Sequence, residues 1–153
     1  MTFTADKAID PVINQFKQYD ADIQLALLWY GYLDIKDQLH PAPPPAVTQP
    51  ADAVYHQIQA LSKEEQLQAQ RDLANHTDTP ISRAYGALNP NGKLQVWLSL
   101  AQGMEEGTII NLPENYELPS ETQEFVNQIK GLNLEQRISV AMASVEQMGV
   151  YVG

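Results

Sequence analysis

The chain has 153 residues, the length of one ordinary domain, and this is enough to bury about two-thirds of the surface that the unfolded chain would expose. It carries 19 acidic and 9 basic residues, a formal net charge of −10, so its surface should repel nucleic-acid phosphates and anionic lipids. The absence of cysteine excludes disulfides, thiolate metal sites and a thiol nucleophile, and it fits a reducing compartment such as the cytoplasm.

The N-terminal segment does not look like a targeting signal. Its sequence, MTFTADKAIDPVINQF, has neither the basic start nor the continuous apolar core of a secretory signal. No stretch of the chain approaches the roughly 20 apolar residues that span a bilayer. We therefore expect a soluble protein.

The first two helices begin at recognisable caps. Asp10 followed by Pro11 predicts a helix with Asp10 as its N-cap, running to about Gln18. Asp20 is expected to cap the helix that follows it.

The second helix contains the stretch QLALLWYGYLD, residues 24–34, which carries no charge from residue 25 to residue 33. Residues at the i, i+3, i+4, i+7 spacing form one helical face, made of Leu25, Leu28, Trp29 and Tyr32. Leu27 and Leu33 lie off that face, so the helix is apolar nearly all round and is predicted to lie in the middle of a bundle. Its rings exceed what one small helix needs for its own packing, and the question is what lies against them.

A proline-rich stretch follows, with the sequence HPAPPPAVTQPAD over residues 40–52. Clustered prolines disfavour a helix and favour an extended polyproline conformation. The sequence therefore predicts a long connector inside one domain.

Several later helix starts carry capping signals. The capping-box spacing occurs at Ser62 with Glu65, at Ser120 with Gln123 and, in a weaker form, at Asn133 with Gln136. Thr79 followed by Pro80 repeats the pattern of a cap and then a proline.

The motif NPNGK, residues 89–93, is expected to end one helix and precede another that runs from about Leu94 to Glu106 and stops at Gly107. Residues 108–119 are predicted to form a second ordered loop. No segment alternates apolar and polar residues long enough to predict a strand, and there is no repeat of fixed period. We therefore expect an all-α fold of about seven helices in a single domain, residues 1–153.

The polar residues do not form a recognisable catalytic or metal site. None of His40, His56 and His76 is followed by an acidic or histidine partner three or four positions later, the spacing of a helical metal site. No serine lies in a nucleophile-elbow motif, and there is no Gly-rich phosphate loop or basic-aromatic pattern for nucleic acid. The sequence predicts no metal and does not support an enzyme.

The unusual features are apolar. One side of the helix that begins GKLQVWLSLAQGM is made of Leu94, Trp97, Ala101 and Met104. A large ring beside small residues on a helix face either packs as a knob into a neighbouring helix or borders a slot. The loop NLPENY adds Leu112, Pro113 and Tyr116, and the last helix aligns Ile138, Ala141, Met142, Val145 and Met148. Composition leaves two interpretations open, because such stripes form either an ordinary core or the lining of a ligand site.

The run QRDLANHTDTPISRAYGALNPNGKLQVW, with QLALLWYGYL before it and INLPENYEL after it, resembles the N-terminal domain of the orange carotenoid protein. It is most similar to the helical carotenoid proteins, the stand-alone relatives of that domain in cyanobacteria. The order of motifs is specific: DLAN-x-TDTPI, then N-x-K-L-x-x-W, then P-x-x-Y, then QMG. The resemblance covers nearly the whole chain.

This resemblance implies two interleaved four-helix subdomains with a ketocarotenoid, canthaxanthin before echinenone, in a tunnel between them. A rod-like polyene is longer than the ~10–12 Å width of one helix and must pass between two layers, which agrees with that arrangement. Aromatic and methionine side chains would give it polarisable contacts without polar groups that need partners.

The family's tunnel positions fall on residues of this chain in four segments. They are Leu25, Leu28, Trp29 and Tyr32; Leu94, Trp97 and Met104; Leu112, Pro113 and Tyr116; and Val145 and Met148. Three further tunnel positions depart from the orange protein, with Gln70 for methionine, Leu98 for tyrosine and Ala101 for glycine. Gln70 is the oddest, because an amide facing a polyene would need its own hydrogen-bond partner.

The function implied is photoprotection by physical quenching of singlet oxygen, with two alternatives in the same family: direct quenching of phycobilisome excitation, or carriage of carotenoid. The sequence shows no counterpart of the C-terminal switching domain, so photoswitching is not expected. Met142 replaces an arginine with which the orange protein engages the phycobilisome. Implied partners are carotenoid and either the phycobilisome or a carotenoid-donating protein, at the thylakoid surface, with a monomer or weak homodimer left open.

Overall fold

The computed structural model describes residues 9–38, 48–112 and 116–150. Over those ranges the chain forms eight α-helices and no strand, so the prediction of an all-α fold is confirmed, with one helix more than expected. The helices are α1 Asp10–Gln18, α2 Ala21–Ile35, α3 Thr48–Gln59, α4 Lys63–Asn75, α5 Pro80–Gly86, α6 Pro90–Glu106, α7 Gln123–Lys130 and α8 Leu134–Glu146. Two short 3₁₀ turns, η2 Lys36–Gln38 and η3 Ser120–Thr122, follow α2 and precede α7.

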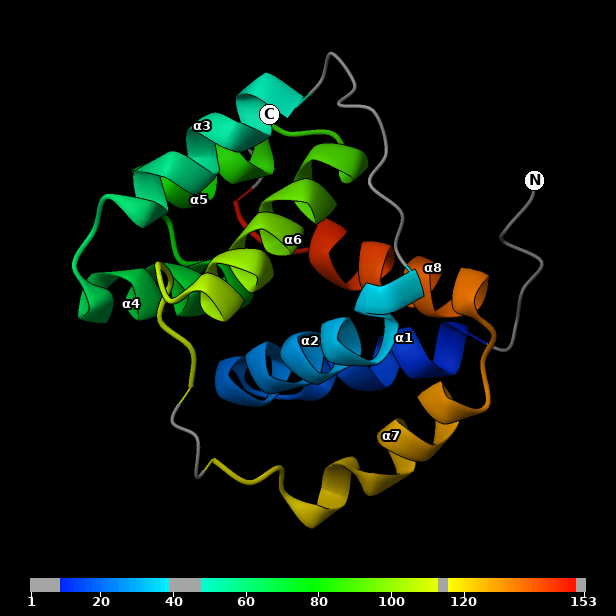
Figure 1. The fold of residues 1–153 in the computed structure, drawn as a ribbon. Coiled ribbons are helices and arrows are strands. Elements are labelled where there is room, and N and C mark those ends of the chain that lie inside the picture. The colour runs from blue at the N-terminus through cyan, green and yellow to red at the C-terminus, as the bar shows by residue number, and fades with distance from the viewer. Residues whose placement is uncertain (1–8, 39–47, 113–115, 151–153) are drawn as a thin grey trace.

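The helices form two groups (Figure 1). The middle of the chain supplies α3, α4, α5 and α6, which pack on one another, while α1, α7 and α8 pack together with α2 beside them. The groups meet where α6 lies against α8 and where α2 lies against α4. Because the second group comes from both ends of the chain, the two groups are interleaved in sequence. None of the described helices is long and apolar enough to cross a membrane.

Four of the predicted caps are present. The side chain of Asp20 accepts a hydrogen bond from the Ile23 N–H at 3.0 Å, and Thr79 accepts one from the Ser82 N–H at 3.0 Å. Complete capping boxes start α4 and α8, at Ser62 and Asn133. These caps satisfy N–H groups that have no partner inside the helix.

Two predicted caps are wrong. Asp10 is already the first residue of α1, whose N-cap is Ile9 without a side-chain hydrogen bond. Ser120 begins η3 instead of capping α7, and Thr122, at the N-cap of α7, makes no capping bond with its side chain. In both places the predicted capping residue is instead the first residue of the helix or 3₁₀ turn. The sequence spacing is the same for a cap and for a first-turn residue, so it does not distinguish the two.

Two helix starts lie earlier in the chain than predicted. α3 begins at Thr48, inside the proline-rich stretch, because Pro50 lies in the first turn, where its missing N–H leaves no helical hydrogen bond unmade. Residues 39–47 of that stretch lie outside the described residues. α6 begins at Pro90, since Asn89 is its N-cap and accepts from the Gly92 N–H at 2.7 Å. Gly107 ends α6 with a φ of +88°, as predicted.

The prediction that α2 lies wholly inside a bundle is correct for its first half only. Residues 23–27 are buried, whereas Tyr30 is 42% exposed and Leu33 is 36% exposed. The second half of α2 borders a cavity, so its apolar residues are only partly covered by protein. The continuous apolar surface of this helix therefore exceeds what its neighbouring helices bury.

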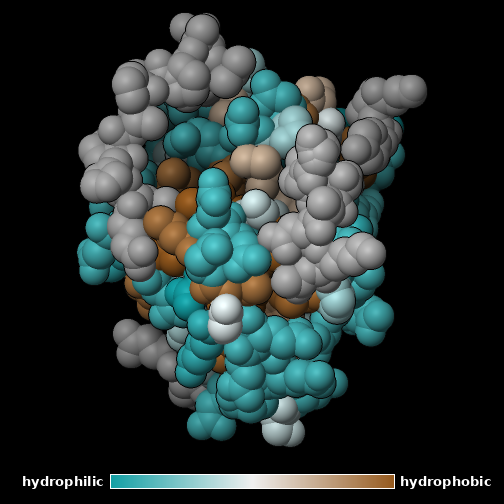
Figure 2. Space-filling view, turned by 90° about the vertical axis from the view of Figure 1, so that its right-hand side faces the viewer, coloured by the Kyte–Doolittle hydropathy of each residue, from teal (hydrophilic) through white to brown (hydrophobic). Residues whose placement is uncertain are grey.

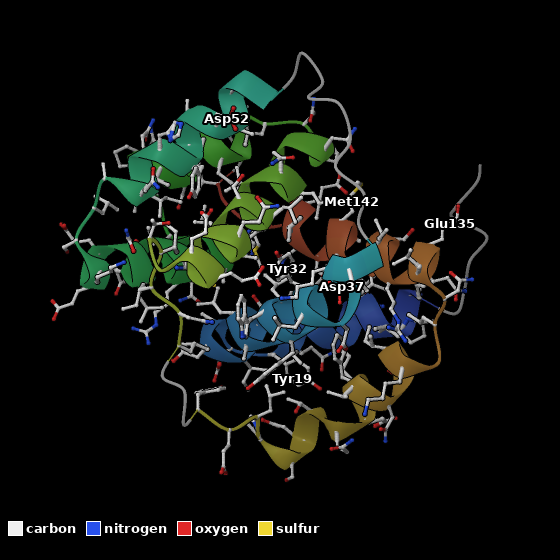
Figure 3. The ribbon with its side chains drawn as sticks, in the orientation of Figure 1. Tyr19, Tyr32, Asp37, Asp52, Glu135 and Met142 are labelled. Carbon is white, nitrogen blue, oxygen red and sulfur yellow. The ribbon has the colours of Figure 1, made fainter. Side chains whose placement is uncertain are left out.

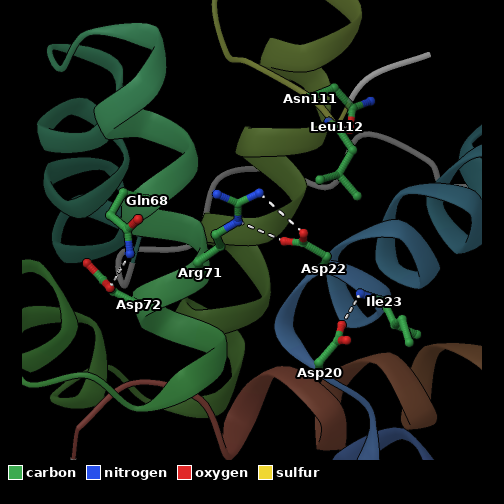
Figure 4. A network of polar contacts seen from close by, with 8 residues as sticks. All are labelled: Asp20, Asp22, Ile23, Gln68, Arg71, Asp72, Asn111 and Leu112. Atoms are coloured by element: carbon green, nitrogen blue, oxygen red, sulfur yellow. Dashed lines mark hydrogen bonds and ion pairs between the residues drawn. The ribbon is translucent and has the colours of Figure 1, made fainter. Parts of the chain in front are cut away.

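Polar contacts join the two helix groups, among them the following two. Arg71 of α4 makes a two-pronged ion pair with Asp22 of α2, with Nε–Oδ1 at 2.8 Å and a terminal guanidinium nitrogen to Oδ2 at 3.2 Å (Figure 4). The Lys93 ammonium of α6 donates to the Glu146 carbonyl at the end of α8, at 2.9 Å. These contacts limit how far the two groups can slide past each other, so the space between them has a defined shape.

Candidate functional site

The main cavity lies between the two helix groups and has a volume of about 440 Å³. Its longest wall is α2, which lines it from Leu25 to Ile35. Opposite α2, α6 contributes Leu94, Trp97, Leu98, Ala101 and Met104. The remaining walls come from α8, through residues such as Ile138, Ala141 and Val145, and from α7 and the end of α1.

A side cavity of about 370 Å³ adjoins the main cavity, because both are lined by Trp29, Tyr30 and Met104. Its other walls are Ala26, Asn111, Leu112 and Tyr116. The loop after α6 therefore extends the hollow beyond the helices. The two cavities thus share a boundary that includes Trp29 and Met104.

The structure brings most of the predicted site residues to these two cavities. Those that line the main cavity are Leu25, Leu28, Trp29, Tyr32, Gln70, Leu94, Trp97, Leu98, Ala101, Met104 and Val145. Leu112 and Tyr116 line the side cavity. Pro113 lies outside the described residues. Met148 is 1% exposed in the hydrophobic core and lines neither cavity, because α8 ends before it and the chain turns away at Gly149.

Sequence reasoning missed the part of the lining that comes from α1, α7 and the loop before α7. These residues are Phe16, Leu118, Phe125, Val126 and Ile129. Phe125 and Ile129 are one helical turn apart, and this apolar spacing was the signal that could have placed α7 against the cavity. The helix is only eight residues long, which is why its apolar face is easily overlooked.

Gln70 has the partner that its position requires. Its side chain is 1% exposed, and its amide nitrogen donates to the Ile110 carbonyl at 3.2 Å. Gln66, one turn earlier on α4, accepts from the Ile110 N–H at 2.9 Å. The two amides therefore fix the loop that follows α6, and the Gln70 donor is occupied by protein. A polar side chain can thus border an apolar cavity without an unpaired donor.

Apolar side chains also gather at the surface near the cavity. In Figure 2 they cross the middle of the visible face, with hydrophilic residues above and below. Tyr32 lies between α2 and α6, and Met142, which is half-buried, lies on α8 (Figure 3). Over the part of the chain that the structure describes, no three acidic or histidine side chains converge to hold a metal ion. His56 and His76 are exposed, and His40 lies outside the described residues.

A cluster of three polar side chains joins the ends of α2 and α6 beside the cavity. The Tyr32 hydroxyl donates to Glu105 Oε1 at 2.5 Å, and the Lys36 ammonium donates to Glu105 Oε2 at 2.6 Å. The hydrogen bond from Lys36, and then that from Tyr32, lowers the pKa of Glu105 below its ordinary 4.5. Desolvation and the bond to Glu105 raise the pKa of Tyr32 to about 12. The cluster is thus fully formed at neutral pH.

Changing Glu105 to glutamine should slightly lower the free energy of unfolding at neutral pH. In acid, the free energies of unfolding of the variant and the wild type should become more nearly equal. A carboxylate whose pKa is lowered by folding stabilises the fold at any pH above its pKa in the unfolded chain, 4.5. This contribution is lost as the pH falls through the lowered pKa of the folded protein. The free energies of unfolding of both proteins, measured by urea denaturation at neutral pH and below pH 4.5, check this. The matched control is Glu106→Gln, one position later and exposed. An equal pH dependence for both variants would contradict the prediction.

Comparison with known proteins assigns the chain to a family. Residues 2–151 match the family model described as "Orange carotenoid protein, N-terminal". An "Orange carotenoid-binding protein" of Synechocystis sp. is 37% identical, and the match covers 99% of this chain and 48% of that protein. An "Orange carotenoid-binding domain-containing protein" of Nostoc sp. is 34% identical, over 98% of this chain and 97% of that protein. The chain therefore spans about half of the first relative and nearly all of the second.

Solved structures show the same fold. The Orange Carotenoid Protein of Anabaena (Nostoc) sp., solved binding canthaxanthin, superposes with a TM-score of 0.87 at 37% identity, over 94% of this chain and 46% of that one. The Red Carotenoid Protein of the same organism, also solved binding canthaxanthin, gives a TM-score of 0.81 at 38% identity, over 93% of this chain and 98% of that one. At these identities the likeness extends beyond the fold to the sequence that forms it.

Proposed function

Because the chain belongs to the family of the orange carotenoid protein N-terminal domain, we propose that its cavity holds a ketocarotenoid and that the protein acts in photoprotection. The observation that carries this proposal is the largely apolar cavity of about 440 Å³ between the helix groups, with Trp29 and Trp97 in its lining. We propose further that residues 1–153 act as one carotenoid-binding domain.

The lining residues suit a long apolar ligand. The walls are mostly leucine, isoleucine, valine and aromatic side chains, which give dispersion contacts without hydrogen bonds. Two of the polar side chains that border the cavity bond to protein, Gln70 to the Ile110 carbonyl and Tyr32 to Glu105, whereas the buried Ser144 hydroxyl, which also borders it, has no hydrogen-bond partner among the described residues. Gln70 and Tyr32 therefore each have a protein partner that does not depend on a ligand.

In this function the bound pigment would accept excitation from singlet oxygen and release it as heat. The protein residues would hold and shield the pigment. Trp29 and Trp97 offer broad ring surfaces, and Met104 offers a flexible, polarisable side chain where the two cavities meet. No side chain needs to form or break a bond. Canthaxanthin is the first candidate, because it is the pigment named for two of the similar structures, and echinenone is the second.

Two other functions fit the same site. Direct quenching of phycobilisome excitation would use the same pigment but needs a docking surface, and the uncharged Met142 on α8 cannot make an ion pair there. Carriage of carotenoid between proteins would use the open side of the cavity. The pigment and the site are common to all three functions, so singlet-oxygen quenching is distinguished only by a measurement of activity.

Singlet-oxygen quenching should require the pigment. Apo protein and protein loaded with canthaxanthin are compared at equal concentration by the lifetime of singlet oxygen, before and after long illumination. The loaded protein should shorten the lifetime much more and keep that activity, because a physical quencher is not consumed. If apo protein protected equally well, or if activity fell in step with methionine oxidation, the side chains would be acting as sacrificial scavengers. Phycobilisome fluorescence with added protein tests the first alternative.

A further inference from the structure

Tyr85 is the largest fully buried side chain of the described residues and lies behind the cavity wall. It belongs to α5, is 0% exposed, and lines neither cavity. Two of its neighbours do line the main cavity: Trp97 on α6 and Val145 on α8. Tyr85 is therefore placed to act on the cavity through these neighbours.

One hydroxyl group joins the three helices. The Trp97 indole Nε1–H donates to the Tyr85 hydroxyl oxygen at 3.0 Å. The same hydroxyl donates its proton to the Val145 carbonyl at 2.5 Å. Val145 is in the last turn of α8, and its carbonyl also accepts from the Met148 N–H at 3.2 Å, so the Tyr85 hydroxyl is a second partner at this helix end. Burial raises the pKa of Tyr85, so the hydroxyl keeps the proton that it donates.

The ring of Tyr85 has little freedom to move. A Cβ built on Gly149, whose φ is +80°, would lie 2.6 Å from Tyr85 Cδ1, so the backbone there is packed directly on the ring. On another side the Lys93 ammonium lies 5.8 Å from the ring centroid and donates to the Glu146 carbonyl. Because the ring is fixed, the hydroxyl is a fixed acceptor for the indole of Trp97.

This geometry determines which part of Trp97 a ligand would meet. The indole has one polar group, its N–H, and that group points to a residue outside the cavity lining. The carbon atoms of the ring are left to form the wall, and Trp97 as a whole is 7% exposed. Any other orientation of the indole would leave a buried donor unpaired.

We propose that Tyr85 is a positioning residue for the pigment: its hydroxyl holds the Trp97 indole in one orientation against the ligand, and thereby sets the absorption of the bound carotenoid. This inference rests on the proposed function. It assigns a role to a residue that the ligand does not touch, and that role depends on a single hydrogen bond from Trp97.

The hydrogen bond itself can be tested without pigment. In a Trp29→Phe protein Trp97 is the only tryptophan, so fluorescence excited selectively at tryptophan comes from Trp97 alone. Adding Tyr85→Phe removes the hydroxyl and keeps the ring, so the fluorescence anisotropy of Trp97 in the apo protein should fall and its emission maximum should move. Unchanged anisotropy and emission would overturn the inference. If Tyr85→Phe does not fold, indole N–H exchange in the wild type decides: the Trp97 proton should exchange much more slowly than that of Trp29, and equal rates would contradict the fixed bond.

The link to the pigment is tested by a double-mutant cycle. Tyr85→Phe should shift the visible absorption maximum of the canthaxanthin-loaded protein, because the indole of Trp97 then loses the hydrogen bond that fixes its orientation against the pigment. In a Trp97→Phe background the same change should have no further effect on the absorption maximum. The matched control is Tyr55→Phe, which removes a half-buried tyrosine hydroxyl of α3 away from the cavity lining and should not shift the spectrum.

An equal shift in both backgrounds would show that Tyr85 does not act through Trp97. If the wild type takes up no carotenoid, the proposed function fails, while the apo measurement still tests the bond.

Discussion

Replacing Trp29 and Trp97 together by alanine is expected to lower the affinity for canthaxanthin by at least about a hundredfold while leaving the helices formed. Removing both rings takes away two apolar surfaces that line the cavity and leaves a larger space, in which the pigment would make fewer close contacts. Trp29 and Trp97 come from α2 and α6, on opposite sides of the main cavity. The measurement is pigment occupancy and affinity after reconstitution, with far-ultraviolet circular dichroism to follow helix content.

The control for this experiment is a second pair of aromatic residues that lie outside the lining. Tyr19 packs edge-on against Phe125, and Tyr55 packs beside His56, and neither lines a cavity. The double variant Tyr19→Ala with Tyr55→Ala should lose stability but keep its pigment affinity. If both double variants lost affinity equally, the effect would come from general destabilisation, and the assignment of the cavity as the pigment site would be wrong.

The sequence predicted the fold class and the apolar helix faces because both depend on local patterns, whereas the assignment of those faces to a ligand tunnel came from the resemblance to a known family. Leu25, Leu28, Trp29 and Tyr32 follow helical periodicity, and periodicity alone places them on one face. What lies opposite that face depends on contacts between segments far apart in the chain. The approach of α6 to α2 across the cavity was available only from the resemblance to a known family.

Two features of the cavity that the sequence did not show have physical causes of the same kind. Met148 shares the apolar side of α8 in the sequence pattern, but the helix ends at Glu146 and the following backbone turns at Gly149. The partner of Gln70 is a backbone carbonyl of Ile110, forty positions away, which no side-chain pattern reveals. Side-chain periodicity thus predicts which residues share a face, whereas a lining also depends on where each helix ends and where the loop backbone lies.

Changing Gly149 to alanine is expected to destabilise the protein by about 2–5 kcal/mol, which is a large part of the stability of a small domain. Two effects add at this position. The φ of +80° is unfavourable for any residue with a Cβ, at about 1–2 kcal/mol, and the new methyl group would clash with Tyr85 Cδ1, which it would approach to 2.6 Å. The ring cannot move away easily, because its hydroxyl is bonded to both Trp97 and Val145.

The matched control separates these two effects. Gly107 has nearly the same backbone conformation, with φ +88°, but a Cβ there would have no atom within 4 Å. Gly107→Ala should therefore show the conformational cost alone, about 1–2 kcal/mol. Urea denaturation of both variants measures the difference, and a clash should appear as an additional loss of about 1–3 kcal/mol in Gly149→Ala. Equal losses would mean that the chain at Gly149 is not packed on Tyr85, and the fixed position of the Tyr85 ring, on which the orientation of Trp97 depends, would lose its main support.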